Sequence, residues 1–128
     1  MNYMFKNTNL LVVPDLNTPK CTDLKGTFED CGSLLYADLS NWTLSKVVNV
    51  SNMFDGCARV STIILPKGLR PRYARDMFSN CKSLTQVNIK DIDFSQCIDM
   101  MGAFYNCYGL TVIPRLDTRV CNSLESIF

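Results

Sequence analysis

The chain has 128 residues, of which 47% are hydrophobic and 20% are charged, and its formal net charge is +1. A charge this close to zero argues against nucleic acid as a partner. No apolar run approaches the roughly 18 residues of a membrane-spanning helix, so we expect no membrane insertion. The apolar stretch near the N-terminus is too short for a signal peptide, and Pro14 interrupts it.

One unit recurs along the chain: Phe, two residues, Cys, two residues, then Leu or Val. The phenylalanines are 23, 26, 24, 26 and 24 residues apart. A period of this size is typical of solenoids, in which each coil buries its apolar face only against its neighbours. In the first copy, Thr8 takes the cysteine position and Leu11 the leucine position. The copies begin at Phe5, Phe28, Phe54, Phe78 and Phe104, and Phe128 opens another.

Each copy begins with an extended run. In the fourth copy, the last residues of this run, Val87, Asn88 and Ile89, alternate between apolar and polar, and this alternation is typical of half-buried strands. We expect the strands of successive coils to pair in parallel, and Pro14 and Pro114 to shorten the first and last of them. The expected strand ranges are 34–39, 60–65, 84–89 and 110–113.

A return segment then leads to the next copy. Val47, Val50 and Phe54 recur at three and four residues, which predicts one or two turns of α- or 3-10 helix on the opposite side. We therefore predict an α/β repeat: a right-handed solenoid of about five coils, with short parallel strands on one face and short helical turns on the other. The approximate coils are 5–27, 28–53, 54–77, 78–103 and 104–128.

The seven cysteines follow the repeat. One set lies three residues after Phe and the other seven residues before it, a position that holds Val47 or Pro71 elsewhere. A position that accepts such residues is small and buried, so we expect reduced, packed thiols. Disulfides between equivalent positions are the alternative. We expect no zinc site, because the chain has no Cys-x-x-Cys pair and no histidine. The two sets are Cys31, Cys57, Cys81 and Cys107, and Cys21, Cys97 and Cys121.

The outward side chains of successive strands should align in columns, and solenoids bind partners along such faces. Tyr36 is the strongest single anchor, because aromatic residues are over-represented at binding hot spots. The alternative is that these are ordinary surface residues of a sheet that binds nothing. The candidate residues are Tyr36, Asp38, Thr62, Ile64, Gln86, Asn88 and Val112.

The third return segment is basic and contains two prolines and a glycine. Its cations could bind phosphate or an acidic surface of a partner. A solvated loop on the convex side is the simpler alternative. The candidate anion-binding residues are Lys67, Arg70, Arg72 and Arg75, with Tyr73 among them.

No catalytic constellation is visible. The chain lacks histidine, the commonest general base, and its cysteines occupy repeat positions rather than a distinct nucleophile position. The carboxylates form no paired motif, and no Gly-rich phosphate loop is present. We therefore expect no enzymatic activity, no cofactor and no metal.

The return segments 39–54 and 89–104 resemble the BspA-like leucine-rich repeats of bacterial surface proteins. The resemblance implies a right-handed leucine-rich-repeat solenoid, no enzymatic activity, and adhesion to host surfaces or other cells. Trp42 falls at the aromatic position of that repeat, where we expect half-buried packing. The first segment matches at Leu39, Ser40, Asn41, Trp42, Val47, Asn49, Met53, Phe54 and Cys57, and the second at Ile89, Asp93, Ser95, Cys97, Met100, Phe104 and Cys107.

Two functional hypotheses follow. The first is a non-enzymatic module of an extracellular or cell-surface protein that binds a protein or a glycan through its strand face. The second is a structural segment of a larger assembly, such as a phage particle or a multi-subunit surface complex. Neither end shows a cap, so we expect the ends to dock against neighbours, by self-association for example, or to continue into a longer array.

Overall fold

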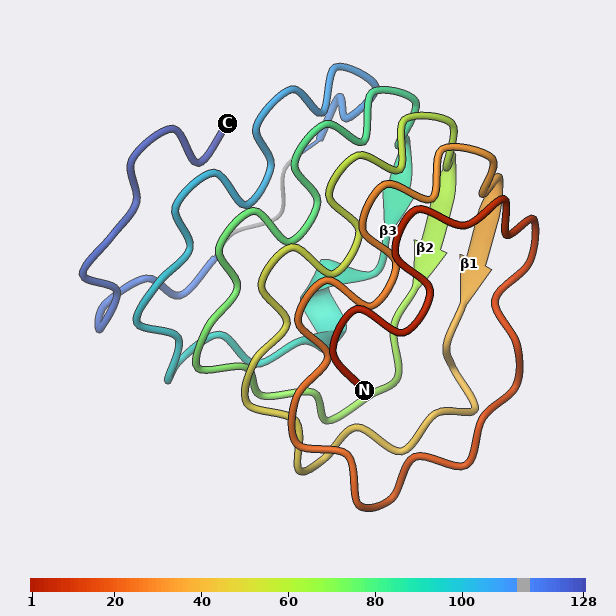
Figure 1. Ribbon diagram of the computed structural model, residues 1–128. Coiled ribbons are helices and arrows are strands. Elements are labelled where there is room, and N and C mark those ends of the chain that lie inside the picture. Colours follow the sequence, from red (N-terminus) through yellow and green to blue (C-terminus); the bar gives the residue numbers. More distant parts are fainter. Residues whose placement is uncertain (113–115) are drawn as a thin grey trace.

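The computed structural model describes residues 1–112 and 116–128, and Figure 1 shows the chain as a series of loops lying side by side in sequence order. The repeated phenylalanines form one stacked row along this series. Neighbouring ring centroids lie between 5.2 Å (Phe28 and Phe54) and 6.1 Å (Phe54 and Phe78) apart. The planes of Phe104 and Phe128 are inclined by only 23°. Stacking of this kind adds to the stability that burial of the rings provides.

Main-chain hydrogen bonds join the segments around these rings. The Phe54 N–H donates to the Met77 carbonyl, and the Phe78 N–H donates to the Ala103 carbonyl, each at 2.9 Å. Intervening N–H groups bond within their own segment, as the Cys57 N–H does to the Phe54 carbonyl at 3.0 Å. The buried backbone is thus paired partly within each repeat and partly with the next one, which is what burial of polar groups requires.

The backbone has positive φ two residues before and two residues after most of the repeated phenylalanines. Glycine, asparagine and aspartate adopt this left-handed region at the lowest cost, and they fill most of these positions. Tyr3 and Ser126, in the first and last segments, are the exceptions. The positions are Tyr3, Asn7, Gly26, Asp30, Asn52, Gly56, Asp76, Asn80, Gly102, Asn106 and Ser126.

These left-handed residues explain why the expected helical turns are wrong. A helix needs consecutive right-handed φ/ψ values, and Asn52 and Gly56 interrupt them around Phe54. Among the described residues, the only helix is the 3-10 helix η1 (Ile89–Asp91), which follows the third strand. The apolar residues of the return segments are nevertheless buried, as at Val47 and Val50.

Three short strands form a parallel sheet in the order β1-β2-β3: β1 (Tyr36–Asp38), β2 (Thr62–Ile64) and β3 (Gln86–Val87). Each lies within an expected range. The central residues Ala37 and Ile63 point inward and are fully buried. The first repeat contributes only an isolated bridge from Val12 to β1. In the last repeat, residues 110–112 are not in a strand, and the expected strand residue Ile113 lies outside the described residues, as does Pro114.

Two packing predictions need correction. Leu11 is 62% exposed, and Leu10 packs against the core instead. The step from the first phenylalanine to the second is only 23 residues, so the buried position falls one residue earlier. Trp42 is fully packed rather than half-buried, at 3% exposure. Its ring lies 5.9 Å from that of Phe28, and its indole N–H donates to the Pro14 carbonyl at 3.2 Å.

The cysteines three residues after each phenylalanine form a second row. The Cys57 thiol donates to the Phe28 carbonyl at 3.1 Å, and the Cys81 thiol donates to the Phe54 carbonyl at 3.2 Å. Each thiol thus links one repeat to the preceding one through a side-chain hydrogen bond. All seven cysteines are free thiols in the structure, as expected from the sequence.

This packing predicts a graded thiol reactivity. Burial raises the pKa of Cys57 and Cys81, and that of Cys97 to about 11, so these thiols should not react with a maleimide at pH 8 until the protein unfolds. The half-buried Cys21 and Cys121 should react first. Peptide mass spectrometry after timed labelling checks the order. Equally fast labelling of all seven thiols in the folded protein would contradict this packing.

Candidate functional site

The candidate site is the strand face, where main-chain pairing aligns the predicted columns. Tyr36 pairs with Thr62, and Thr62 pairs with Gln86. Asp38 pairs with Ile64 in the second column. The structure thus aligns side chains of three repeats in one row and of two repeats in a second. Within each row, neighbouring side chains are spaced by the distance between adjacent strands, about 4.8 Å.

Tyr36 and Asp38 form a polar pair at the β1 end of this face. The Tyr36 hydroxyl donates to Asp38 at 3.4 Å, and 43% of the tyrosine is exposed. Partial desolvation and the neighbouring carboxylate raise the pKa of Tyr36. Hydrogen bonds from the hydroxyl and the N–H of Ser40 lower the pKa of Asp38. At neutral pH the pair therefore presents a neutral phenol beside a carboxylate.

Asn88 was predicted to contact a partner from the strand face, but its side chain is bonded to the protein's own backbone. Its side-chain carbonyl accepts from the Leu65 N–H at 2.7 Å, and its amide donates to the Leu65 carbonyl at 2.8 Å. The amide also donates to Asp91 at 3.2 Å. The side chain thus continues the sheet pairing where the backbone of β3 turns away, which leaves it little capacity to bind a partner.

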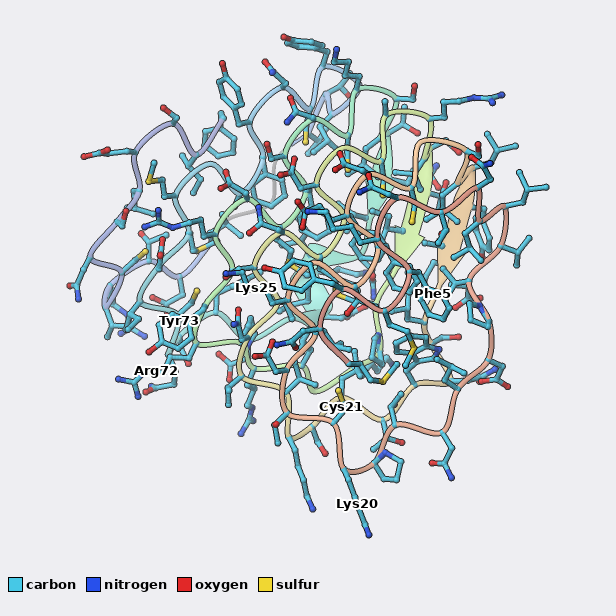
Figure 2. All side chains as sticks on the ribbon, in the orientation of Figure 1. Phe5, Lys20, Cys21, Lys25, Arg72 and Tyr73 are labelled. Atoms are coloured by element: carbon cyan, nitrogen blue, oxygen red, sulfur yellow. The ribbon has the colours of Figure 1, made fainter. Side chains whose placement is uncertain are left out.

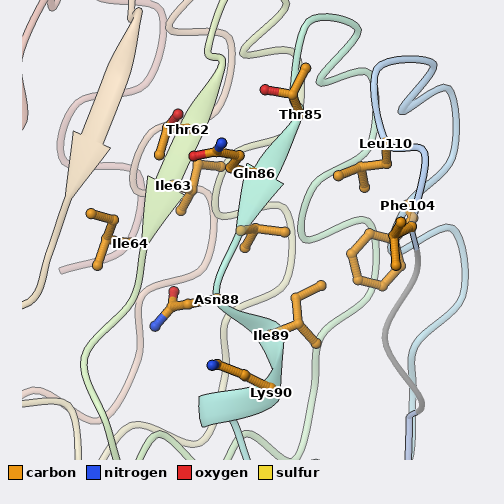
Figure 3. A pocket seen from close by; sticks show the side chains of 12 residues that line it. Thr62, Ile63, Ile64, Thr85, Gln86, Asn88, Ile89, Lys90, Phe104 and Leu110 are labelled. Atoms are coloured by element: carbon orange, nitrogen blue, oxygen red, sulfur yellow. The ribbon is translucent and has the colours of Figure 1, made fainter.

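A groove of about 530 Å³ runs along the side of β3 that faces the last repeat (Figure 3). Gln86 and Thr85 lie on its strand side, and Phe104 and Leu110 come from the neighbouring repeat. Predicted residues that line it are Thr62, Ile64, Gln86, Asn88 and Val112. Val112, at 78% exposure, is not paired with β3, so the described residues 110–112 of the fifth repeat do not extend the sheet.

Sequence reasoning missed an apolar patch at the other end of this face. Leu11, Val12 and Leu35 are 62%, 68% and 47% exposed, and they adjoin Tyr36 through the bridge between Val12 and Tyr36. The sequence does contain a sign of this patch, because Leu10-Leu11 and Leu34-Leu35 are adjacent apolar pairs. In an extended chain, only one residue of each pair can face inward, so the other must be exposed. Exposed apolar side chains of the first two repeats thus lie beside the polar pair of Tyr36 and Asp38.

The four predicted anion-binding residues do not act as one set. Arg70 pairs with Asp93 at 3.3 Å, and Arg75 pairs with Asp99 at 2.9 Å. Arg72 is exposed beside Tyr73 at the edge of the molecule (Figure 2). Lys67 lines a separate groove near the ends of the strands. Two of the four charges are therefore already neutralised, which favours the solvated-loop interpretation.

Neither a metal centre nor a membrane span emerges from residues 1–112 and 116–128. They contain no group of three or more His, Cys, Asp or Glu side chains that could hold a metal ion. No helix in this part of the chain is long and apolar enough to cross a bilayer.

The family model described as "Mycoplasma protein of unknown function, DUF285" matches residues 1–65 and 70–128. The two matched segments leave out only residues 66–69, in the unusual third return segment. No curated protein and no solved structure matches the chain.

Proposed function

The chain belongs to the DUF285 family, and we propose that it is a non-enzymatic repeat module that binds a protein or a glycan through its strand face. We further propose that the module is a right-handed leucine-rich-repeat solenoid of about five coils, displayed on a cell surface for adhesion or recognition. The resemblance of its return segments to BspA-like repeats supports this surface role.

One observation carries the proposal: the paired column of Tyr36, Thr62 and Gln86 across three consecutive strands, in which Tyr36 and Gln86 are exposed and Thr62 is half-buried. Main-chain pairing sets the spacing of these side chains, so a partner would meet a pre-ordered row instead of a flexible loop. Pre-organisation of this kind lowers the entropic cost of binding. The adjoining apolar patch of Leu11, Val12 and Leu35 enlarges the surface on the side of Tyr36.

The inventory of reactive groups supports a non-enzymatic role. The chain contains no histidine. Burial raises the pKa of Cys107 to about 11 and holds the pKa of Cys57 still higher, so these thiols are poor nucleophiles at neutral pH.

The test is a double substitution, Tyr36→Ala with Gln86→Ala. The labelled chain is first applied to a printed array of glycans and extracellular-matrix proteins, and the affinity for the strongest ligand is then measured by biolayer interferometry. Loss of the aromatic anchor Tyr36 should weaken that affinity by about 30-fold.

The matched control is Lys82→Ala, an exposed side chain outside the strand columns. It should leave both the affinity and the thermal melt unchanged. If the double variant binds like the parent protein, or if the array yields no ligand, the strand-face proposal is wrong.

A further inference from the structure

A second groove lies at the corner where the chain leaves β1 and β2, and we name it the corner groove. It has a volume of about 650 Å³ and receives residues from three consecutive repeats. That volume is in the range of small-molecule sites. Its lining comprises Ser40, Trp42, Thr43, Leu44 and Ser45 from the second repeat, Ile64, Leu65, Pro66 and Lys67 from the third, and Asn88 and Asp91 from the fourth.

The unequal lengths of the repeats explain why this groove forms. The second and fourth repeats are 26 residues long, and the third, which lies between them, has 24. The second and fourth carry buried aromatic residues in their return segments, Trp42 and Phe94, whereas the third has Pro66, Lys67 and Gly68. A shorter corner between two longer ones leaves space over it. The family model leaves out residues 66–69, so this corner departs from the common repeat.

The floor of the corner groove is apolar and its rim is polar. Trp42 and Leu65 are at most 3% exposed, and Pro66 is buried beside them. Thr43 and Ser45, which carry hydroxyl groups and are exposed, also line the groove. A few polar groups around an apolar floor are typical of sites that fix the orientation of a small ligand.

Two opposite charges complete the rim. Lys67 is exposed and, among the described residues, forms no ion pair, in contrast to Arg70 and Arg75 of the same segment. Asp91 accepts a hydrogen bond from the Asn88 amide at 3.2 Å, which orients its carboxylate. One cation suits a single carboxylate of a ligand, and the nearby Asp91 disfavours a polymer with closely spaced phosphates.

We propose that the corner groove binds an acidic saccharide, with its carboxylate on Lys67 and its ring hydroxyls on Asp91, Thr43 and Ser45. The apolar face of the sugar ring would lie over Pro66. The proposal rests on the binding function above, but it names the ligand class and a site other than the columns of Tyr36 and Gln86.

The probes are methyl β-D-glucuronide and methyl β-D-glucoside, which differ only at C6, a carboxylate in the first and a hydroxymethyl group in the second. Titration of the ¹⁵N-labelled chain, followed by amide chemical shifts, should show shifts in residues 40–45 and in Ile64, Leu65 and Lys67. The glucuronide should bind at least about threefold more tightly than the glucoside, because its carboxylate gains one exposed ion pair.

Two variants locate the effect. Lys67→Ala should remove the preference for glucuronide, and Lys82→Ala, at an exposed lysine elsewhere, should leave it intact. Equal binding of the two probes, shifts outside the groove, or an equal effect of Lys82→Ala would each overturn the proposal.

The strand-face variant separates this proposal from the wider one. The chain carrying Tyr36→Ala and Gln86→Ala should bind the glucuronide like the parent protein. Weaker binding of the glucuronide by that variant would place the sugar on the strand face and overturn the corner-groove assignment. A chain that fails to bind the glucuronide but still needs Tyr36 for its array ligand would leave the strand-face function intact and remove only this inference.

Discussion

Replacing Phe78 with Ala should lower the free energy of unfolding by about 3–5 kcal/mol. Phe78 is fully buried, and its ring is stacked between Phe54 at 6.1 Å and Phe104 at 5.3 Å. The substitution removes the ring and leaves a cavity in the middle of the row, so that the repeats on either side lose their main apolar contact. Urea denaturation followed by circular dichroism measures the change, and a broadened or biphasic transition would show that the two halves unfold separately.

Phe5→Ala provides the comparison for this result. Phe5 is only partly buried and stacks on one neighbour, Phe28, at 5.5 Å, so its loss should cost clearly less. An unchanged urea midpoint for Phe78→Ala would mean that the central ring does not carry the contact between repeats.

Replacing Gly56 with Ala should lower the free energy of unfolding by about 2 kcal/mol. Gly56 has φ +76°, and an added Cβ would lie 2.3 Å from an Asp30 carboxylate oxygen and 3.3 Å from the Asp30 Cα. Both the backbone angle and the contact with the preceding repeat therefore oppose a side chain. The same denaturation experiment measures the loss.

Gly32→Ala is the matched control. No atom lies within 4 Å of a Cβ added at Gly32, and its φ is not positive, so the change should be neutral or slightly stabilising. Similar losses for the two variants would show that the close approach at Gly56 does not limit stability.

Part of the strand face could be predicted from the sequence. The apolar alternation of Val87, Asn88 and Ile89 indicated which residues of the fourth repeat face inward, and the repeat length indicated which side chains of successive strands meet. The pairs formed by Thr62 with Tyr36 and Gln86 follow this prediction. This works because burial depends mainly on periodicity along the chain, which a single sequence displays.

The candidate binding residues were harder to predict, because their roles depend on contacts between repeats. Asn88 looked like an exposed member of a column, but its amide is bonded to the backbone of Leu65. Arg70 and Arg75 looked like free cations, but carboxylates of the next repeat, Asp93 and Asp99, pair with them. Such partners are about 23 residues away along the chain, and periodicity alone does not reveal them.

The sequence by itself determined the repeat unit, the row of phenylalanines and the buried positions of Cys31, Cys57, Cys81 and Cys97, because one local pattern recurs and each copy meets the same pattern in its neighbour. Only the tertiary structure decided the backbone of the return segments and the corner groove. The left-handed residues, such as Asn52 and Gly56, replace helix with turns because their N–H groups bond to the next repeat. The groove exists because a 24-residue repeat is packed between two of 26 residues, and a difference in length becomes a space only when the three repeats lie side by side.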